Sequence, residues 1–431
     1  MSLLSFTAQW IDSQFNLQHA TLQAQNFRGS HTADRVREAI EGMLNSWGID
    51  KPRVHVILRD NARNMVKAMD DLEVKSVGCV SHTLQLAVHE GLLSQRSVID
   101  ALATARKIVG HFKHSPLAYS RLEDIQKDLK MDVKRLQQDV QVRWNSSLYM
   151  LQSILEQKRA LSVYAADYSL PATLTANQWT LMEKTAEVLA PFEELKRDVS
   201  NPTASAADVI PAITALKRVL SREKTTDQGV RTMKSTLLEA VETRFAEVEE
   251  EPLYSIATLV DPRYKDRFFT KSDNMRLATD NLILEVAKIE RAASEEPEAA
   301  EPMRKTPRQE ASSSLGSVLD EILEENQLEA RSVSTSADVQ VQTYLSEKTR
   351  PRKSNPLHYW KDNSSRFPSL AAVATRFLCA PCTSVDSERL FSAVSNVLDE
   401  KRNRLSPDRV EILIFLKKKL HLIVKPESES E

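Results

Sequence analysis

The stretch PCTSVDSERLFSAVSNVLDEKRNRLSP, residues 381–407, decides how the rest of the chain is interpreted. The spacing of its apolar residues predicts a helix with one apolar face. The last helix of the chain follows, with Ser406 as its N-cap and Pro407 in its first turn, and it carries a second apolar face. The two faces consist of Phe391, Val394 and Leu398, and of Val410, Leu413, Leu416 and Leu420. They hold more apolar surface than residues 338–422 bury alone, so we expect burial against the rest of the chain and against a second copy.

Length and composition indicate a folded, mostly helical protein. A chain of 431 residues with 41% hydrophobic content can bury two or three lobes, and its 8 glycines among many helix formers exclude an all-β fold. The net charge of −2 gives no global attraction for DNA. No stretch approaches the ~20 apolar residues of a membrane span, no signal peptide is visible and three cysteines form no disulfide framework, so we expect a soluble intracellular protein.

The N-terminal part alternates strands and helices. The pattern predicts strands at 3–11 and 15–25, a helix at 31–48, a buried strand at 54–58, a helix at 61–71 and a short strand at 76–79. Asp60 directly follows the buried strand, and His82 opens a series of helices. A carboxylate at a strand end is therefore the first candidate site residue.

The middle of the chain predicts only helices. Helical periods fill residues 144–290, whereas residues 291–314 carry three prolines and many charges with almost no large apolar side chain. Such a composition cannot offset the entropy of ordering, so we expect a disordered linker there. Structure resumes weakly near 317 and firmly from 338 to 422.

Five motifs then occur in a characteristic order. They are Asp60-Asn61-Ala62-Arg63 followed by Cys79-Val80-Ser81-His82, then Arg143-Trp144-Asn145-Ser146, Leu189-Ala190-Pro191-Phe192, Leu259-Val260-Asp261-Pro262-Arg263-Tyr264, and the C-terminal stretch with Asn355-Pro356-Leu357-His358-Tyr359-Trp360 before it. Singly each is weak, but together the series resembles the hAT transposase family over nearly the whole chain. It is most similar to domesticated members that carry a BED-type zinc finger ahead of the transposase body.

The resemblance implies a mostly helical α/β fold, a ribonuclease-H-like core interrupted by a large helical insertion. On this basis we expect an incomplete core at 1–143, the insertion at 144–290, the linker at 291–316, the dimerisation region that completes the core at 317–424, and a disordered tail at 425–431. The BED finger and the first catalytic strand are expected to be missing.

The family cuts DNA with three carboxylates that hold two divalent metal ions such as Mg²⁺. By position Asp60 matches the second carboxylate and Glu388 the third. The first should lie on a strand before the hairpin, and the early Asp12 falls in a turn, directed away from the strand ends. We therefore expect catalysis to be lost and no metal cofactor unless a complete triad lies upstream of Met1. Asp60 is expected to serve as a helix N-cap, and for Glu388 a first-turn position that complements the helix dipole is an equal alternative to the family role.

A missing first strand should also leave both neighbouring strands with unpaired backbone groups, each orphaned group costing about 1–3 kcal/mol where it is buried. The chain would then be either a fragment of a longer protein or a remodelled version. Arg59 also argues against a metal ion at Asp60. A guanidinium beside this residue would pair with the carboxylate or compete with the metal ion, unless it points to solvent.

Two further groups have a functional and a structural interpretation. Arg143, Trp144 and His82 are candidate DNA contacts, the arginine for phosphate and the indole for an unpaired base, although such a tryptophan is more often core. The residues Cys79, His82, Cys379 and Cys382 could ligate zinc by spacing, but buried packing cysteines are favoured. We assign no metal site to the chain.

Taken together, the sequence predicts a catalytically inactive, transposase-derived protein that homodimerises through its C-terminal segment and acts in the nucleus as a DNA-associated regulator of transcription. DNA is the expected partner besides a second copy, with no membrane and no small-molecule substrate. The alternatives are an active metal-dependent transposase or nuclease and a zinc-stabilised helical scaffold without a DNA role.

Overall fold

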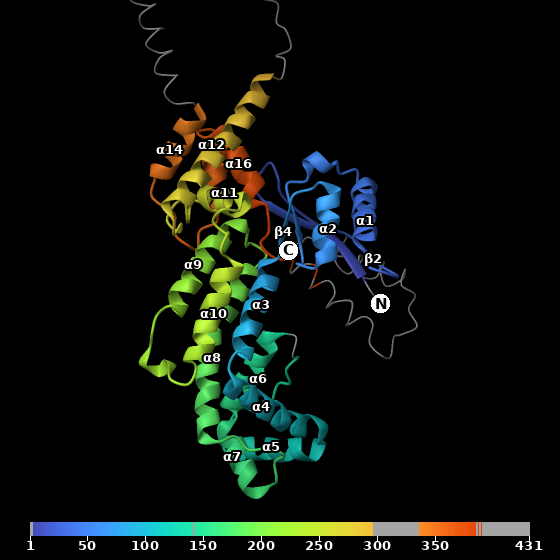
Figure 1. Cartoon of the computed structure of the whole chain (residues 1–431), viewed down its shortest axis with the longest axis vertical. Helices are drawn as coiled ribbons and strands as arrows, with labels where there is room; N and C mark the ends of the chain where they lie inside the picture. The colour runs from blue at the N-terminus through green and yellow to red at the C-terminus, as the bar shows by residue number, and fades with distance from the viewer. Residues whose placement is uncertain (1–2, 141–142, 296–335, 385–386, 388, 390–431) are drawn as a thin grey trace, which may run out of the picture.

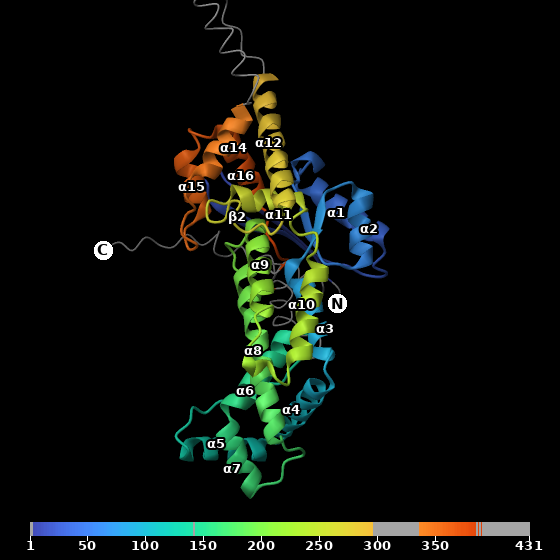
Figure 2. The same ribbon diagram turned by 60° about the vertical axis from the view of Figure 1, so that its left-hand side comes forward.

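The computed structural model describes residues 3–140, 143–295, 336–384, 387 and 389 (Figure 1). The described chain is an elongated α/β molecule dominated by helices (Figures 1 and 2). The strands and the C-terminal helices form one end, and a helical lobe extends from them. The mostly helical α/β class expected from the sequence is confirmed.

The chain begins with a hairpin, β1 (Leu3–Ile11) paired antiparallel with β2 (Leu17–Asn26). Asp12 holds the turn: its Oδ1 accepts hydrogen bonds from the backbone N–H groups of Gln14 and Asn16, both at 2.9 Å. The bond from Asn16, followed by one from Gln18, lowers the pKa of the Asp12 carboxyl. The carboxylate is thus engaged in its own turn.

Two short strands follow the hairpin. After α1 (Ala33–Ser46) and a 3₁₀ turn (Lys51–Arg53), β3 (Ile57–Arg59) runs parallel to β4 (Ser76–Gly78), with α2 (Arg63–Leu72) crossing between them. The predicted strand at 54–58 is wrong in its bounds, because only residues 57–59 find a hydrogen-bonding partner in β4. Its apolar residues Val54 and Val56 still pack in the core.

The strands form two separate sheets within the described residues, β1–β2 and β3–β4. Both lie between the same helical layers: Phe6 of β1 and Ile57 of β3 pack on the cluster formed by α1 and α2, while Leu17 of β2 and Leu58 of β3 pack on the main core. One edge of β1 and one edge of β3 therefore carry no ladder in this part of the chain, as expected from the sequence.

The lobe is made of long amphipathic helices. They are α3 (Val80–Leu93), α4 (Arg96–His114), α5 (Pro116–Asp128), α6 (Trp144–Glu156), α7 (Lys158–Asp167), α8 (Ala176–Val199), α9 (Val209–Leu220) and α10 (Arg231–Arg244), with 3₁₀ turns at Ala206–Asp208 and Thr225–Asp227. The predicted face of α4 is confirmed: Val98, Leu102, Ala105, Ile108, Val109 and Phe112 are all buried. Since α4 packs against α6 and α8, helices on both sides of residue 144 share one core.

The C-terminal helices are α14 (Ser336–Ser346), α15 (Pro356–Asn363) and α16 (Pro368–Leu378) (Figure 2). Helix α16 packs on α11 (Pro252–Val260) and α12 (Ser272–Glu295), α14 packs on α12, and α15 packs on α16. The linker was predicted to start at 291, but α12 continues to Glu295: its residues Leu282 and Val286 are buried, and the exposed residues 291–294 continue the same helix. The rest of the predicted linker lies largely outside the described residues, and the expected domain division stays a prediction.

The Leu259–Tyr264 motif joins these helices to the lobe. The fully buried Asp261 accepts hydrogen bonds from the Arg263 guanidinium, the shortest being Nε to Oδ1 at 2.9 Å and Nη2 to Oδ2 at 2.6 Å, and Arg263 also reaches Asp208 at 3.1 Å. Burial alone would lower the pKa of Arg263, but the bonds to Asp261 raise it overall. The indole Nε1 of Trp360 donates to the Val260 carbonyl at 2.9 Å, so the motif also anchors α15.

Candidate functional site

Asp60 lies at the carboxyl end of β3, where the sequence placed it. Its side chain is exposed, and Oδ1 accepts a hydrogen bond from the Ala62 backbone N–H at 3.0 Å. The N-cap of α2 is Ala62, so the expected helix cap is wrong by two residues. Asp60 instead closes the turn between β3 and α2, because its side chain bonds the backbone two residues ahead.

Arg59 directs its guanidinium to β4 and to the backbone of Asp60. Its Nε donates to Ser76 Oγ at 3.1 Å, and Nη1 donates to the Asp60 carbonyl oxygen at 3.1 Å. The side chain thus lies across the β3–β4 pair rather than in solvent, and burial lowers its pKa. Of the three expected alternatives, pointing to solvent does not describe it and no ion pair with the Asp60 carboxylate forms among the described residues, while competition with a metal ion stays a prediction.

Asn61 locks the strand ends to α3. Its Nδ2 donates to Thr83 Oγ1 at 3.0 Å, and that hydroxyl donates in turn to the Cys79 carbonyl at 3.2 Å. The Asn61 amide lies so close to Gly78 that a Cβ there would meet Oδ1 at 2.1 Å. A side chain at position 78 would therefore force the Asn61 amide to move from the place where it bonds Thr83.

The C-terminal segment 382–384 runs between α3 and α8 at this place. The Val80 N–H donates to the Cys382 carbonyl at 3.1 Å, and the Ser384 N–H donates to Cys79 Sγ at 3.3 Å. On the other side, Cys382 Sγ and Thr383 Oγ1 each reach the Val199 carbonyl at 3.3 Å. Two segments some 300 positions apart in sequence thus meet beside Asp60, and we call this meeting point the strand-end corner (residues 59–62, 78–83 and 382–384).

The cysteines of the corner are packing residues in this structure. Cys79 and Cys382 are buried, and burial raises the pKa of the Cys382 thiol well above its ordinary value. His82 lies in the first turn of α3 with an exposed side chain, directed away from that core. Among the described residues no three His, Cys, Asp or Glu side chains are grouped to hold a metal ion.

The same observation bears on the two-metal site that the resemblance implies. Asp60 stands in the described corner without a second and third carboxylate beside it. Glu388 lies outside the described residues, although its neighbour Ser384 is placed at the corner. The described residues alone therefore do not fit a metal pair, and the catalytic roles of Asp60 and Glu388 stay predictions.

Arg143 and Trp144 start α6 and differ in exposure. Arg143 is the exposed N-cap residue, whereas Trp144 is only 1% exposed and lies edge-on to Phe192 with ring centroids 6.3 Å apart. Stacking on a DNA base would require the indole to leave this packing. Asn145, next along, accepts a hydrogen bond from Lys196 Nζ of α8 at 2.6 Å, which ties the start of α6 to the end of α8.

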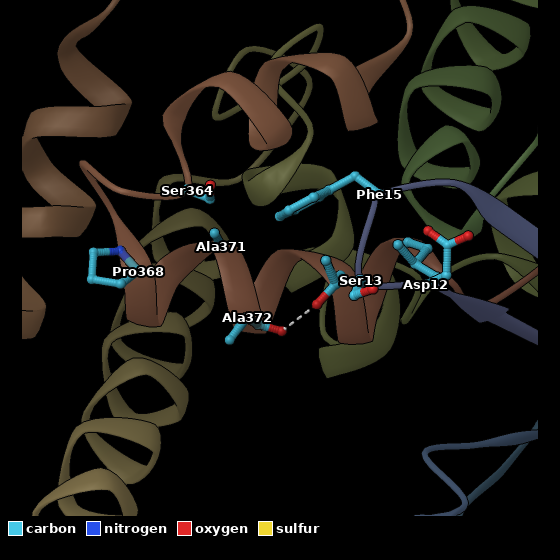
Figure 3. A pocket seen from close by; sticks show the side chains of 9 residues that line it. Asp12, Ser13, Phe15, Ser364, Pro368, Ala371 and Ala372 are labelled. Atoms are coloured by element: carbon cyan, nitrogen blue, oxygen red, sulfur yellow. Dashed lines mark hydrogen bonds between the residues drawn. The ribbon is translucent and has the colours of Figure 1, made fainter.

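A separate pocket of about 370 Å³ lies between the hairpin turn and α16 (Figure 3). It is lined by Ile11, Asp12, Ser13, Phe15, Ser364, Pro368, Ala371, Ala372 and Thr375. The Asp12 carboxylate points away from the alanines of α16 (Figure 3) and is held by the hairpin turn. The lining offers apolar surface and hydroxyls but no acid–base pair.

Comparison with known proteins assigns families to most of the chain. Residues 1–84 match the ZBED1 RNase-like domain, 77–188 the ZBED1 RNase-like helical domain, and 340–420 the hAT family C-terminal dimerisation region. The chain is a hAT-family, transposase-derived protein. The resemblance inferred from the five motifs is thereby confirmed.

Individual relatives of this hAT-family chain agree with the assignment. It is 29% identical to human zinc finger BED domain-containing protein 4, over 97% of the chain and 36% of that protein, and 30% identical to human zinc finger BED domain-containing protein 6, over 84% and 40%. It is 24% identical to the putative AC transposase of Zea mays, over 96% of the chain and 54% of the relative. The chain thus spans about a third to a half of the length of these relatives.

The predicted dimerisation residues lie outside the described part of the chain, but within the matched dimerisation region. They are Phe391, Val394, Leu398, Leu413, Leu416 and Leu420. Sequence reasoning missed Asn61, Lys196 and Arg389 as residues of this area. Only the fold shows that the end of α8 approaches the start of α6 and residues 382, 383 and 389.

Proposed function

We propose that this hAT-derived chain is a catalytically inactive protein that homodimerises through its C-terminal segment and associates with nuclear DNA as a regulator of transcription. The observation that carries the proposal is the match of residues 340–420 to the hAT dimerisation region. The described start of that region, residues 340–384, forms an integral part of the fold through α14–α16. A dimer contact made further along would therefore join two complete molecules.

The arrangement at the corner supports the loss of catalysis. Asp60 Oδ1 is engaged in a turn, and the described residues place no further carboxylate of a metal-binding group beside it. Arg59 lies along the same strand pair, where its positive charge would oppose a bound cation.

DNA association and nuclear location are supported by relatives whose names include BED zinc fingers, a putative transposase and a putative transcriptional regulator. None of the described helices has the length and apolarity needed to cross a bilayer.

Sedimentation velocity of the full chain tests the dimer. We expect a species of twice the chain mass, and Leu416→Asp with Leu420→Asp should shift it to monomer, because two charges cannot be buried unpaired at an interface. The matched control is Leu117→Asp, at a leucine of α5 that is 61% exposed and should leave the dimer intact. A monomer in the unchanged chain at micromolar concentration would refute the proposal.

The alternative, an active nuclease, predicts metal-dependent cleavage of a labelled terminal-repeat duplex. We expect no cleavage with Mg²⁺ or Mn²⁺. Cleavage that disappears in Asp60→Asn would replace the proposed function with the enzymatic one.

A further inference from the structure

The connection between α14 and α15 carries the densest run of positive charge in the chain. Residues 348–353 read KTRPRK, with Lys348, Arg350, Arg352 and Lys353 and no acidic residue among them. No other six consecutive residues of the sequence hold four lysines or arginines. We call residues 348–353 the basic segment.

The fold keeps the basic segment at the surface. All six residues are exposed, and the Arg352 side chain is 77% exposed. None of the six belongs to a helix or a strand, and the two helices that they join lie at the outer side of the molecule (Figure 2). A partner can therefore reach the charged groups of the segment and most of its backbone.

Contacts hold the flanks of the segment in place. Glu347, the acid directly before it, accepts a hydrogen bond from the Tyr359 hydroxyl at 2.7 Å and is paired with Arg366. Directly after the segment comes Ser354, and then Asn355 caps α15 by accepting a hydrogen bond from the Leu357 N–H at 2.9 Å. The neighbouring carboxylate of Glu347 is thus engaged with groups outside the segment.

Arg350 anchors the middle of the segment. Its backbone N–H donates to the Pro262 carbonyl at 2.7 Å, and its guanidinium lies 5.3 Å from the centre of the Tyr359 ring. Among the described residues, the segment forms one ion pair, between Arg352 and Asp198 at 3.1 Å, with side chains that are 77% and 50% exposed. A pair so open to water contributes little to stability, so a partner's carboxylate can displace Asp198 at small cost.

We propose that the basic segment is the docking site for a nuclear import receptor, one that takes an exposed basic peptide into a groove lined by carboxylates and aromatic rings. Short runs rich in lysine and arginine are typical of import signals and of nucleic-acid contacts. The receptor fits better, because a groove can bind the backbone of a stretch without helix or strand as well as its cations, whereas duplex DNA would use the cations alone. The inference deepens the nuclear location of the proposed function, and it rests on that function.

The test follows the full chain with two readouts. One is the affinity for the purified import receptor that binds basic peptides, and the other is the nuclear-to-cytoplasmic ratio of the chain fused to a fluorescent protein. The variant is Lys348→Gln/Arg352→Gln/Lys353→Gln, which keeps Arg350 because of its contacts with Pro262 and Tyr359.

Two controls separate the segment from net charge and from another basic run. The first removes the same charge from three scattered side chains that are 61–66% exposed, in Lys67→Gln/Lys127→Gln/Lys288→Gln. The second, Lys401→Gln/Arg402→Gln/Arg404→Gln, changes a basic run outside the described residues. Circular dichroism checks that all three variants remain folded.

We expect the segment variant to bind the receptor at least about tenfold more weakly and to lose its nuclear accumulation, while both controls stay close to the unchanged chain. An equal loss in the scattered control would reduce the effect to net charge, and a loss confined to the second control would move the signal elsewhere. Either result overturns the proposal. So does a segment variant that binds random-sequence duplex DNA more weakly but the receptor unchanged, since the segment would then serve nucleic acid.

The two readouts also separate this inference from the proposed function. An unchanged chain that stays outside the nucleus contradicts the nuclear location of the proposed function, and receptor binding then decides the inference by itself. A chain that is nuclear but does not bind the receptor overturns the inference and leaves the proposed function in place.

Discussion

At the scale of single residues, His55 makes the fold sensitive to acid. It lies directly before β3, with its ring edge-on to Phe377 of α16 at a centroid distance of 4.7 Å. Its Nε2 is buried without a hydrogen-bond partner among the described residues. Burial, together with the charges of Arg376 and Lys75, lowers its pKa to about 4.

In the unfolded chain His55 becomes protonated below about pH 6.5, whereas in the native fold it stays neutral down to about pH 4. Between these pH values the unfolded state binds more protons, so the free energy of unfolding falls as the pH falls. We expect a loss of about 2 kcal/mol between pH 7 and pH 5, measured by urea denaturation. His55→Gln and His55→Phe cannot titrate and should both flatten this dependence, whatever their effect at pH 7. An unchanged pH dependence in both variants would show that the loss arises elsewhere.

At the scale of elements, the two small sheets carry open edges. Within the described residues β1 pairs only with β2, and β3 only with β4. In residue-resolved hydrogen exchange of the full chain, we therefore expect alternate amides of β1 to exchange much faster than their neighbours, because every second N–H points to the open edge. Central helices such as α3 serve as the protected reference. Uniform protection along β1 would reveal another strand paired to that edge.

The elements also show what sequence patterns can predict. The face of α4 is predictable because its apolar residues recur at helical spacing from Val98 to Phe112, over about four turns, so burial follows from spacing alone. The length of β3 is not predictable, since a run such as Val54–Leu58 stays apolar whether or not a neighbouring strand pairs with it. Asp60 could be placed at a strand end from its motif. The convergence of Lys196, Arg143 and Arg389 could not be predicted from the sequence, because it depends on how α6, α8 and the C-terminal segment pack.

At the scale of the whole molecule, Lys265 connects the lobe end to the C-terminal helices. Its side chain is completely buried, and Nζ donates to the carbonyls of Tyr344 at 2.5 Å and Glu347 at 2.8 Å, at the end of α14. The ammonium also lies 4.4 Å from the centre of the Tyr344 ring. Burial lowers the pKa of Lys265 to about 8, so the native fold holds this charge mainly through these contacts.

Lys265→Met keeps the volume but leaves both carbonyls without their donor, which should cost about 1–3 kcal/mol per buried group. Because those carbonyls lie in and directly after the last turn of α14, we expect peptides from α14–α16 to exchange hydrogen faster, while peptides from α4 and α5 at the far end of the lobe keep their rates. Lys271→Met, at a side chain that is 65% exposed, is the matched control and should change neither. Faster exchange in both regions would mean that Lys265 stabilises the molecule as one cooperative unit, whereas unchanged rates would show that the buried contacts contribute nothing to docking. If the C-terminal helices loosen selectively, the dimer should weaken as well. The C-terminal segment can join two molecules only when it is anchored to the molecule that carries it.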